Sequence, residues 1–227
     1  MLSAGLGQAQ APDQTQATGP PVTYERLLQA DREPGNWLMY SGDYRSHHYS
    51  SLKQITSENI ERLHPAWIYQ MHRSKVETTP IVVDGIMYVT RPPSDVIALD
   101  AATGRALWTW QYRIPDKVVV CCGEVNRGLA ILGNRIFVNT LDANLVALDA
   151  RSGRMLWKKK LADHTVGYTA TGAPLVVKDK VIVGIAGAEL GIRGFVDAYY
   201  ASTGEHAWRF NTIPGPGEPG SETWGKD

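Results

Sequence analysis

The sequence VIALDAATGRALW, residues 96–108, returns twice further along the chain. Its copies are LVALDARSGRMLW at 145–157 and VDAYYASTGEHAW at 196–208. The closing tryptophans, Trp108, Trp157 and Trp208, are separated by 49 and then 51 residues. A unit of about fifty residues that repeats in this way is typical of a radial array of β-sheets.

Each unit contains four short stretches with the composition of β-strands, separated by turn signals. In the first unit they are residues 80–83, 86–90, 96–100 and 106–110, and the sequences DG and ATG separate them. The sequence therefore predicts an all-β fold, a β-propeller of four-stranded antiparallel blades in which the three tryptophans pack between neighbouring blades. In the third unit Tyr200 replaces the aspartate of the turn, which predicts a looser turn there.

Three units do not close a propeller ring, so the chain is predicted to be the N-terminal part of a longer protein. Trp67, in LHPAWIYQ, lacks a preceding copy of the repeat. We expect this segment to supply an outer strand to the last blade. Residues 1–35 are predicted to be a disordered leader or the remnant of a secretory signal, because AQA, ending at Ala11, resembles the end of such a signal.

Composition excludes several classes of partner. The chain of 227 residues has 23 basic and 23 acidic residues and no basic run, which argues against nucleic acid and anionic membrane surfaces. No apolar run reaches 18 residues, so no membrane span is expected.

The repeats differ at one polar position. Counted back from the tryptophan of each unit, Glu77 lies 31 residues away, Arg127 lies 30 and Thr171 lies 37. The third unit carries a six-residue insertion, within GIAGAELGIRG at 184–194, so all three residues share one phase at the entry to a first strand. First strands are innermost in a propeller, and the three side chains are expected to converge on the axis. The insertion contains Glu189, and such an irregularity is where function is expected.

The only two cysteines, Cys121 and Cys122, are adjacent. A disulfide between neighbours closes no loop and gives little of the usual stabilisation. Two reduced thiols that act as small apolar side chains are an equal alternative on this pattern alone.

The set CCGEVNRG at 121–128 and GAELGIRG at 187–194, in adjacent units, resembles the pyrroloquinoline quinone (PQQ)-dependent alcohol dehydrogenases. The resemblance runs from about Asn36 to the C-terminus and implies about three blades of an eight-bladed propeller, with residues 36–227 forming the N-terminal part of the PQQ-binding domain.

The resemblance also implies roles for individual residues. Cys121 and Cys122 would form a disulfide ring against one face of the quinone, and Glu189 would bind the metal, Ca²⁺ or a lanthanide. The family often has serine where Ala186 stands, which implies one hydrogen bond fewer. The catalytic base is expected beyond residue 227. The residues expected at the edge of the cofactor or lining it are Glu77, Arg127, Thr171, Gly187 and Ala188.

The function implied by the resemblance is oxidation of a small alcohol by an exported, periplasmic enzyme that passes electrons to a c-type cytochrome or a similar acceptor. Two alternatives remain open at this point. One is a cofactor-free propeller scaffold of the outer-membrane assembly type, and the other is a PQQ-dependent sugar dehydrogenase.

Overall fold

The computed structural model describes residues 21–71 and 75–224 and contains three four-stranded antiparallel sheets. Each sheet is a meander in which neighbouring strands follow one another in the sequence. The first sheet has β1 (Ile81–Val83), β2 (Ile86–Arg91), β3 (Asp95–Asp100) and β4 (Ala106–Trp110). The second has β5 (Leu129–Leu132), β6 (Arg135–Thr140), β7 (Asn144–Asp149) and β8 (Met155–Lys160). The third has β9 (Leu175–Val177), β10 (Lys180–Gly184), β11 (Phe195–Tyr200) and β12 (His206–Asn211).

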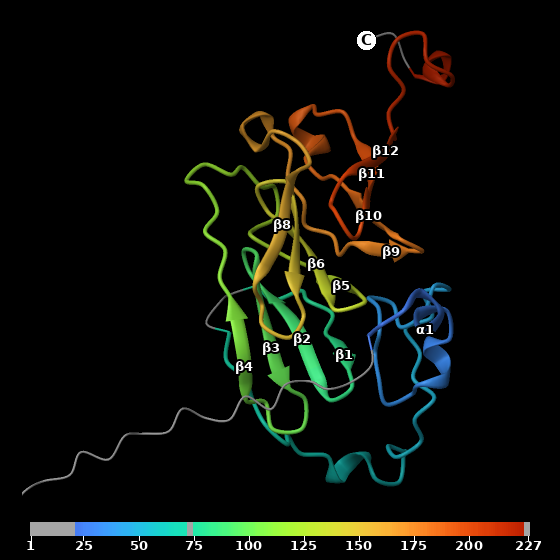
Figure 1. Cartoon of the computed structure of the whole chain (residues 1–227), viewed down its shortest axis with the longest axis vertical. Helices are drawn as coiled ribbons and strands as arrows, with labels where there is room; N and C mark the ends of the chain where they lie inside the picture. The colour runs from blue at the N-terminus through green and yellow to red at the C-terminus, as the bar shows by residue number, and fades with distance from the viewer. Residues whose placement is uncertain (1–20, 72–74, 225–227) are drawn as a thin grey trace, which may run out of the picture.

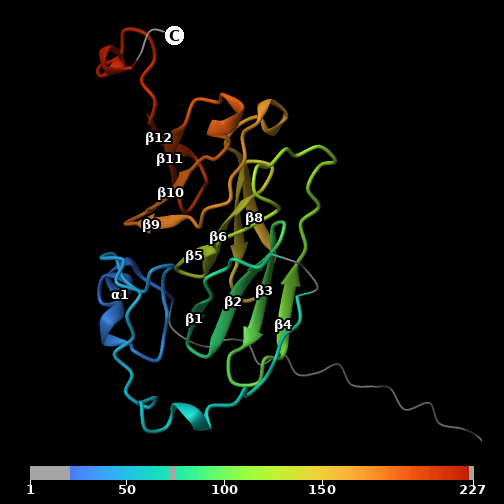
Figure 2. The same ribbon diagram turned by 180° about the vertical axis from the view of Figure 1, so that it is seen from behind.

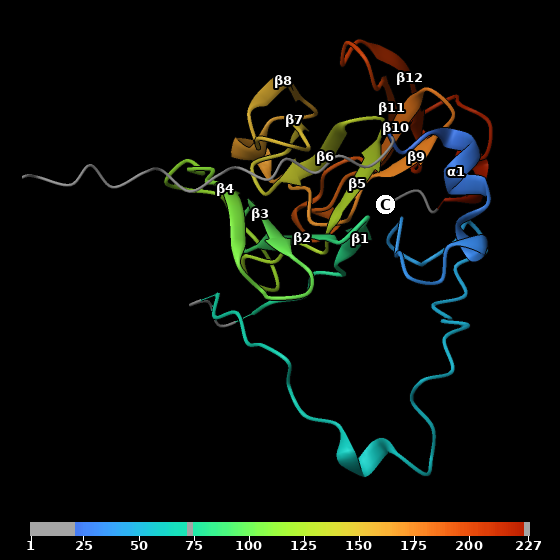
Figure 3. The ribbon, with the colours of Figure 1, turned by 60° about the horizontal axis from the view of Figure 1, so that its bottom comes forward.

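The three sheets fan out from a common inner side, as blades of a propeller do. Figure 3 shows β1, β5 and β9 nearest to the N-terminal segment, with β4, β8 and β12 at the periphery. The second sheet lies between the other two, and its middle strands are buried. Ile136, Phe137 and Val138 of β6 have no exposed surface. The four-stranded antiparallel blades predicted from the repeat are confirmed.

Tryptophans join one blade to the next through a glycine turn. Trp108 lies against Gly153, where an added Cβ would come within 2.6 Å of the indole ring, and its Nε1 donates to Ala150 O at 3.1 Å. Trp67 repeats this arrangement on Gly104, with its Nε1 donating to a backbone carbonyl at 3.1 Å. The predicted docking role is therefore correct for Trp108, and Trp67 has the same role although its segment forms no strand in the described structure.

The later tryptophans depart from this pattern. Trp157 packs against Gly204, but its buried Nε1 has no hydrogen-bond partner within the part of the chain that the structure describes. Trp208 is 41 % exposed, so the prediction that it is buried between blades is wrong for this chain. The described residues contain no fourth sheet after β12 that could present a glycine turn to its indole.

The turn that ends each repeat is held by an aspartate in the first two blades. Asp100 Oδ1 accepts from the backbone amides of residues 102 and 103 at 3.1 and 2.8 Å, and Asp149 makes the equivalent pair of bonds. Tyr200 keeps the backbone bonds of the turn, with Gly204 N donating to Tyr200 O at 2.7 Å, but its side chain cannot accept these amides. The third turn therefore lacks the bonds that the aspartate makes and keeps the backbone bonds.

The N-terminal segment packs against the blades. Residues 1–20 of the predicted leader lie outside the described residues, whereas residues 21–35 contain the short helix α1 (Tyr24–Leu28) and the 3-10 turn η1 (Ala30–Arg32). Leu27 is buried and Val22 pairs with Gly133 of the second blade. The disorder predicted as far as residue 35 is therefore not found between residues 21 and 35, because α1 has an apolar side to bury.

Arg26 of α1 fixes this segment to the first blade. Its guanidinium donates to both carboxylate oxygens of Glu33 and to both of Asp84, in the β1–β2 turn, at 2.6–3.1 Å. These hydrogen bonds lower the pKa of both Glu33 and Asp84. The structure thus links the N-terminal segment to the first blade through paired charges.

A long exposed arc joins the N-terminal segment to the first blade (Figures 1 and 2). It contains the 3-10 turn η2 (Ile60–Arg62) and presents large apolar side chains, among them Ile55 and Ile68, to the surface. The remaining 3-10 turns are η3 (His164–Val166), η4 (Ala188–Leu190) and η5 (Ser221–Thr223). Among the described residues, no helix has the length and apolar character needed to cross a membrane.

Candidate cofactor site at the inner strands

Three side chains that share one phase of the repeat meet in space. Arg127 Nη1 donates to Thr171 Oγ1 at 2.9 Å, and Arg127 Nη2 lies 3.0 Å from Glu77 Oε2. Each residue lies in the segment leading into the first strand of its blade: Glu77 before β1, Arg127 before β5 and Thr171 before β9. The convergence predicted from the sequence is therefore confirmed as geometry.

Backbone bonds between blades fix these three segments relative to one another. Thr79 N donates to Arg127 O at 3.1 Å, and Arg127 N donates to Thr171 O at 3.0 Å. The polar side chains remain accessible, since those of Arg127 and Glu77 are 40 % and 42 % exposed. Such an exposed ion pair contributes little to stability, about 0–1 kcal/mol.

A cavity of about 370 Å³ extends from Arg127 towards the N-terminal segment. Its walls are largely apolar and include Leu38, Tyr44 and Pro174. Pockets of this size with an apolar lining and a few polar groups are typical of small-molecule sites. Arg127 therefore belongs to the polar cluster with Glu77 and Thr171 and also lines this cavity.

The cysteine pair lies in the loop before β5. The two Sγ atoms are exposed and 2.7 Å apart, and no bond joins them in this structure. Hydrogen bonding with Cys122 and with the Glu189 carboxylate raises the pKa of the Cys121 thiol to about 11. Glu189, from the insertion in the third unit, thus lies beside the cysteine pair of the second unit.

The insertion folds around glycine. Gly187 has φ +120°, and an added Cβ would collide with the carbonyl oxygen of Gly167, so only glycine fits. Ala188, next in the chain, is exposed, while the backbone of Ala186 pairs with that of Thr169 at 2.8 and 2.9 Å. The segment before Glu189 is therefore held tightly against the third blade.

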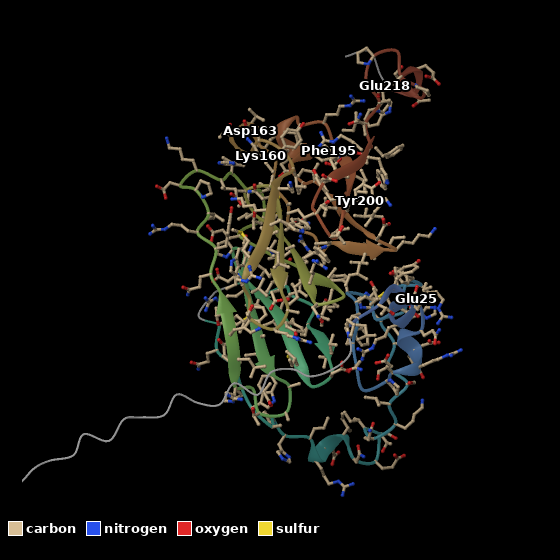
Figure 4. The ribbon with its side chains drawn as sticks, viewed as in Figure 1. Glu25, Lys160, Asp163, Phe195, Tyr200 and Glu218 are labelled. Carbon is tan, nitrogen blue, oxygen red and sulfur yellow. The ribbon has the colours of Figure 1, made fainter. Side chains whose placement is uncertain are left out.

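Glu189 does not pair with the nearest base in the sequence. Arg193 instead donates to Ile213 O at 2.7 Å and forms an ion pair with Glu218, in the segment that follows β12 (Figure 4). Since Arg193 is engaged elsewhere, a local ion pair does not account for the position of Glu189. The carboxylate faces the exposed cysteine loop.

The part of the chain that the structure describes contains no group of three or more His, Cys, Asp or Glu side chains that could hold a metal ion. Glu189 could therefore supply one carboxylate ligand and not a complete metal site. Carboxylate oxygens are the ligands that hard cations such as Ca²⁺ prefer.

One contact of the site was not predicted from the sequence. Lys75 Nζ donates to Cys122 O at 2.8 Å, and the Lys75 side chain also lies over Gly123. Lys75 stands two residues before Glu77, so the same segment contacts both the cysteine loop and Arg127. A lysine before the first strand has no counterpart in the repeat, and the sequence offered no signal for it.

The donor set fits a flat anionic quinone. Arg127 presents planar N–H donors that suit carboxylates and carbonyls, Thr171 adds a hydroxyl, and the cysteine sulfurs form an exposed, polarisable surface nearby. Each of these groups is accessible, and Glu189 places a hard oxygen ligand beside them.

Comparison with known proteins identifies the class to which this fold and site belong. Residues 37–227 match the family model described as PQQ: Glucose/ethanol/alcohol dehydrogenase, beta-propeller domain. The chain belongs to this family of PQQ propellers.

Curated relatives share substantial identity with the chain. It is 47 % identical over 197 residues to the quinohemoprotein alcohol dehydrogenase ADH-IIG of Pseudomonas putida, an alignment that covers 84 % of this chain and 27 % of the relative. It is 42 % identical over 216 residues to the quinoprotein ethanol dehydrogenase of Pseudomonas aeruginosa, covering 91 % of this chain and 34 % of that protein. The chain thus spans about a third or less of the length of these relatives.

Solved structures show the same fold. The quinohemoprotein alcohol dehydrogenase ADHIIG of Pseudomonas putida has a TM-score of 0.80 at 45 % identity, over 87 % of this chain and 30 % of that structure. A europium-containing methanol dehydrogenase has a TM-score of 0.81 at 42 % identity, over 86 % of this chain and 35 % of that one. The β-propeller prediction is confirmed, and the family that the chain matches is that of the PQQ propellers and not a cofactor-free scaffold.

Proposed function

We propose that this chain supplies part of the cofactor site of a PQQ-dependent alcohol dehydrogenase. The observation that carries the proposal is the contact of Glu77, Arg127 and Thr171 across three blades, with Glu189 and the cysteine pair next to one another. The relatives described above are named as alcohol dehydrogenases, which favours an alcohol over a sugar as the substrate.

Each residue of the candidate site has a defined role in this proposal. When bound, PQQ would accept a hydride from the alcohol carbon, with a metal ion polarising a quinone carbonyl. Arg127 would donate to the polar edge of the quinone while Glu77 holds its guanidinium in place. Thr171 would donate its hydroxyl proton to the same edge, and Gly187 and Ala188 would line the cofactor because their small size admits close approach.

Glu189 is proposed as a metal ligand. Ca²⁺ and a lanthanide are both hard cations that suit a carboxylate, and a structural neighbour of this chain is named as a europium-containing enzyme. The other metal ligands and the catalytic base are proposed to come from parts of the protein outside this chain. The chain by itself is accordingly expected to show no turnover.

The remaining proposals concern redox and location. A disulfide between Cys121 and Cys122 is proposed to form a flat surface against the quinone, which requires an oxidising compartment such as the periplasm. Electrons are proposed to pass to a c-type cytochrome or similar acceptor, in keeping with relatives named as quinohemoproteins.

A chimeric enzyme tests the proposal. This chain replaces the matching 27 % of the Pseudomonas putida relative, so that the relative supplies the missing part of the site. We expect dye-linked oxidation of a primary alcohol that depends on both added PQQ and Ca²⁺ or a lanthanide. A chimera that folds and binds neither cofactor would contradict the proposal.

A further inference from the structure

A row of polar side chains, buried except for the half-buried Thr78, lies next to the segments that carry the Glu77–Arg127–Thr171 cluster. Thr90 Oγ1 donates to Thr78 Oγ1 at 2.9 Å and lies 3.2 Å from Asn126 O. Asn126 Nδ2 donates to Asn139 O at 2.8 Å, and Asn139 Nδ2 donates to Gly172 O at 3.0 Å. We refer to Thr78, Thr90, Asn126 and Asn139 as the buried relay.

Every cluster residue has a chain neighbour that either belongs to the buried relay or is hydrogen-bonded by it. Thr78 follows Glu77, Asn126 precedes Arg127, and Gly172 follows Thr171. Each cluster residue is therefore joined through one peptide unit to a residue that these hydrogen bonds hold.

The relay uses equivalent positions of successive blades. Thr90 and Asn139 are each the fifth residue of the second strand, β2 or β6, and each lies 18 residues before the tryptophan of its unit. Each reaches the segment that enters the first strand of the next blade. In the third blade this fifth position is Gly184 of β10, which has no side chain to continue the row.

A contribution to the stability of the fold does not explain why an asparagine occupies position 139. Its side chain is 1 % exposed, and its Oδ1 has no partner among the described residues. Burying an unpaired polar oxygen costs about 1–3 kcal/mol, and the three residues before Asn139 in β6 are the apolar Ile136, Phe137 and Val138. The side-chain group that makes a hydrogen bond is Nδ2, which donates to the carbonyl of Gly172, a residue 33 positions further along the chain.

We infer that Asn139, with Asn126 behind Arg127, is a positioning residue that sets the Arg127–Thr171 contact. Asn139 anchors Gly172 and hence the carbonyl of Thr171, which accepts from Arg127 N at 3.0 Å. The same anchor holds Thr171 Oγ1 at 2.9 Å from the guanidinium. The geometric inference stands on these contacts, and its consequence for cofactor binding rests on the proposed function.

Residue-resolved amide exchange by NMR on the folded chain tests the inference without any cofactor. In Asn139→Ala the Arg127 amide, which donates to Thr171 O, should exchange about fivefold faster, the loss expected for one hydrogen bond of about 1 kcal/mol. The Thr79 amide, which donates to Arg127 O, should keep its protection and serves as an internal reference.

Asn144→Ala is the matched control. Asn144 is also buried and also donates from Nδ2 to a carbonyl, at 3.1 Å, but its acceptor is Asp142 in the adjoining turn. This variant should leave the Arg127 amide unchanged. Asn139→Leu, which keeps the branched shape and loses the donor, should reproduce Asn139→Ala and provides the readout where the alanine variant does not fold.

Equal protection of the Arg127 amide in the Asn139 variants and in Asn144→Ala would overturn the inference. Measuring PQQ binding to the chimera that carries the Asn139 variants distinguishes failure of this inference from failure of the proposed function. Faster exchange without weaker PQQ binding would leave the positioning role intact and contradict the assignment of Arg127 and Thr171 to the cofactor. Weaker binding without faster exchange would contradict the positioning role.

Discussion

Replacing Gly153 by alanine should test how one blade is held to the next. Gly153 has φ +69°, and an added Cβ would come within 2.6 Å of Trp108 Cε3 and 2.9 Å of Cδ2. Real Cβ atoms do not approach carbon this closely, so the indole must move away. Its Nε1 bond to Ala150 O at 3.1 Å would be strained or lost.

The expected cost has three parts. A left-handed alanine costs about 1–2 kcal/mol. Displacing a packed ring costs about 1–3 kcal/mol, and losing the indole hydrogen bond costs about 0.5–1.5 kcal/mol. Gly153→Ala should therefore lower the free energy of unfolding by about 3–6 kcal/mol.

Gly133→Ala is the matched control, because Gly133 has φ +62° and nothing within 4 Å of an added Cβ. It should lose only the backbone part, about 1–2 kcal/mol. Urea unfolding followed by circular dichroism measures both variants against the unaltered chain. Equal destabilisation of the two variants would refute the claim that Trp108 docking on the glycine turn joins the blades.

Three further outcomes are expected. Tyr200→Asp should add the missing side-chain bonds of the third turn and raise the free energy of unfolding by about 1 kcal/mol, whereas Asp149→Ala should lower it similarly; urea midpoints that move the other way would contradict this account. Arg26→Met should cost about 2 kcal/mol at pH 7. In the folded chain the pKa values of its two partners, Glu33 and Asp84, are lower than in the unfolded chain. The stabilisation from these two carboxylates is therefore present above their unfolded pKa values and is lost as the pH falls below about 4. Urea unfolding should find that the stabilities of the variant and the original chain converge there. Thiol titration of denatured, unreduced protein from an oxidising compartment should find no free thiol, and two free thiols would exclude a bond between Cys121 and Cys122.

The repeat explains how much of this molecule can be predicted from its sequence. The 49- and 51-residue spacings place each strand, and counting back from each tryptophan brings Glu77, Arg127 and Thr171 into one phase. The structure joins these three side chains because equivalent entries to first strands lie side by side.

Other features escape the sequence for physical reasons. Lys75 reaches the carbonyl of Cys122, 47 residues away, through a loop conformation that no periodicity specifies. Thr90 and Asn139 do share a phase, but a single polar residue in an apolar strand gives no sign of its distant partner. The burial of Trp208 was wrongly predicted because its position in the repeat is regular while the described residues place no further blade over it.

The measurement that tests the central claim most directly is equilibrium binding of PQQ and Ca²⁺ to the chimera. Arg127→Met should weaken PQQ binding at least about tenfold, since a charge-assisted hydrogen bond contributes about 1.5–3 kcal/mol. Glu189→Gln should weaken Ca²⁺ binding and alcohol oxidation together, with the circular dichroism spectrum preserved. Glu205→Gln, at an exposed turn away from the cluster, should change neither. Undiminished binding of PQQ by Arg127→Met and of Ca²⁺ by Glu189→Gln would contradict the assignment of this site.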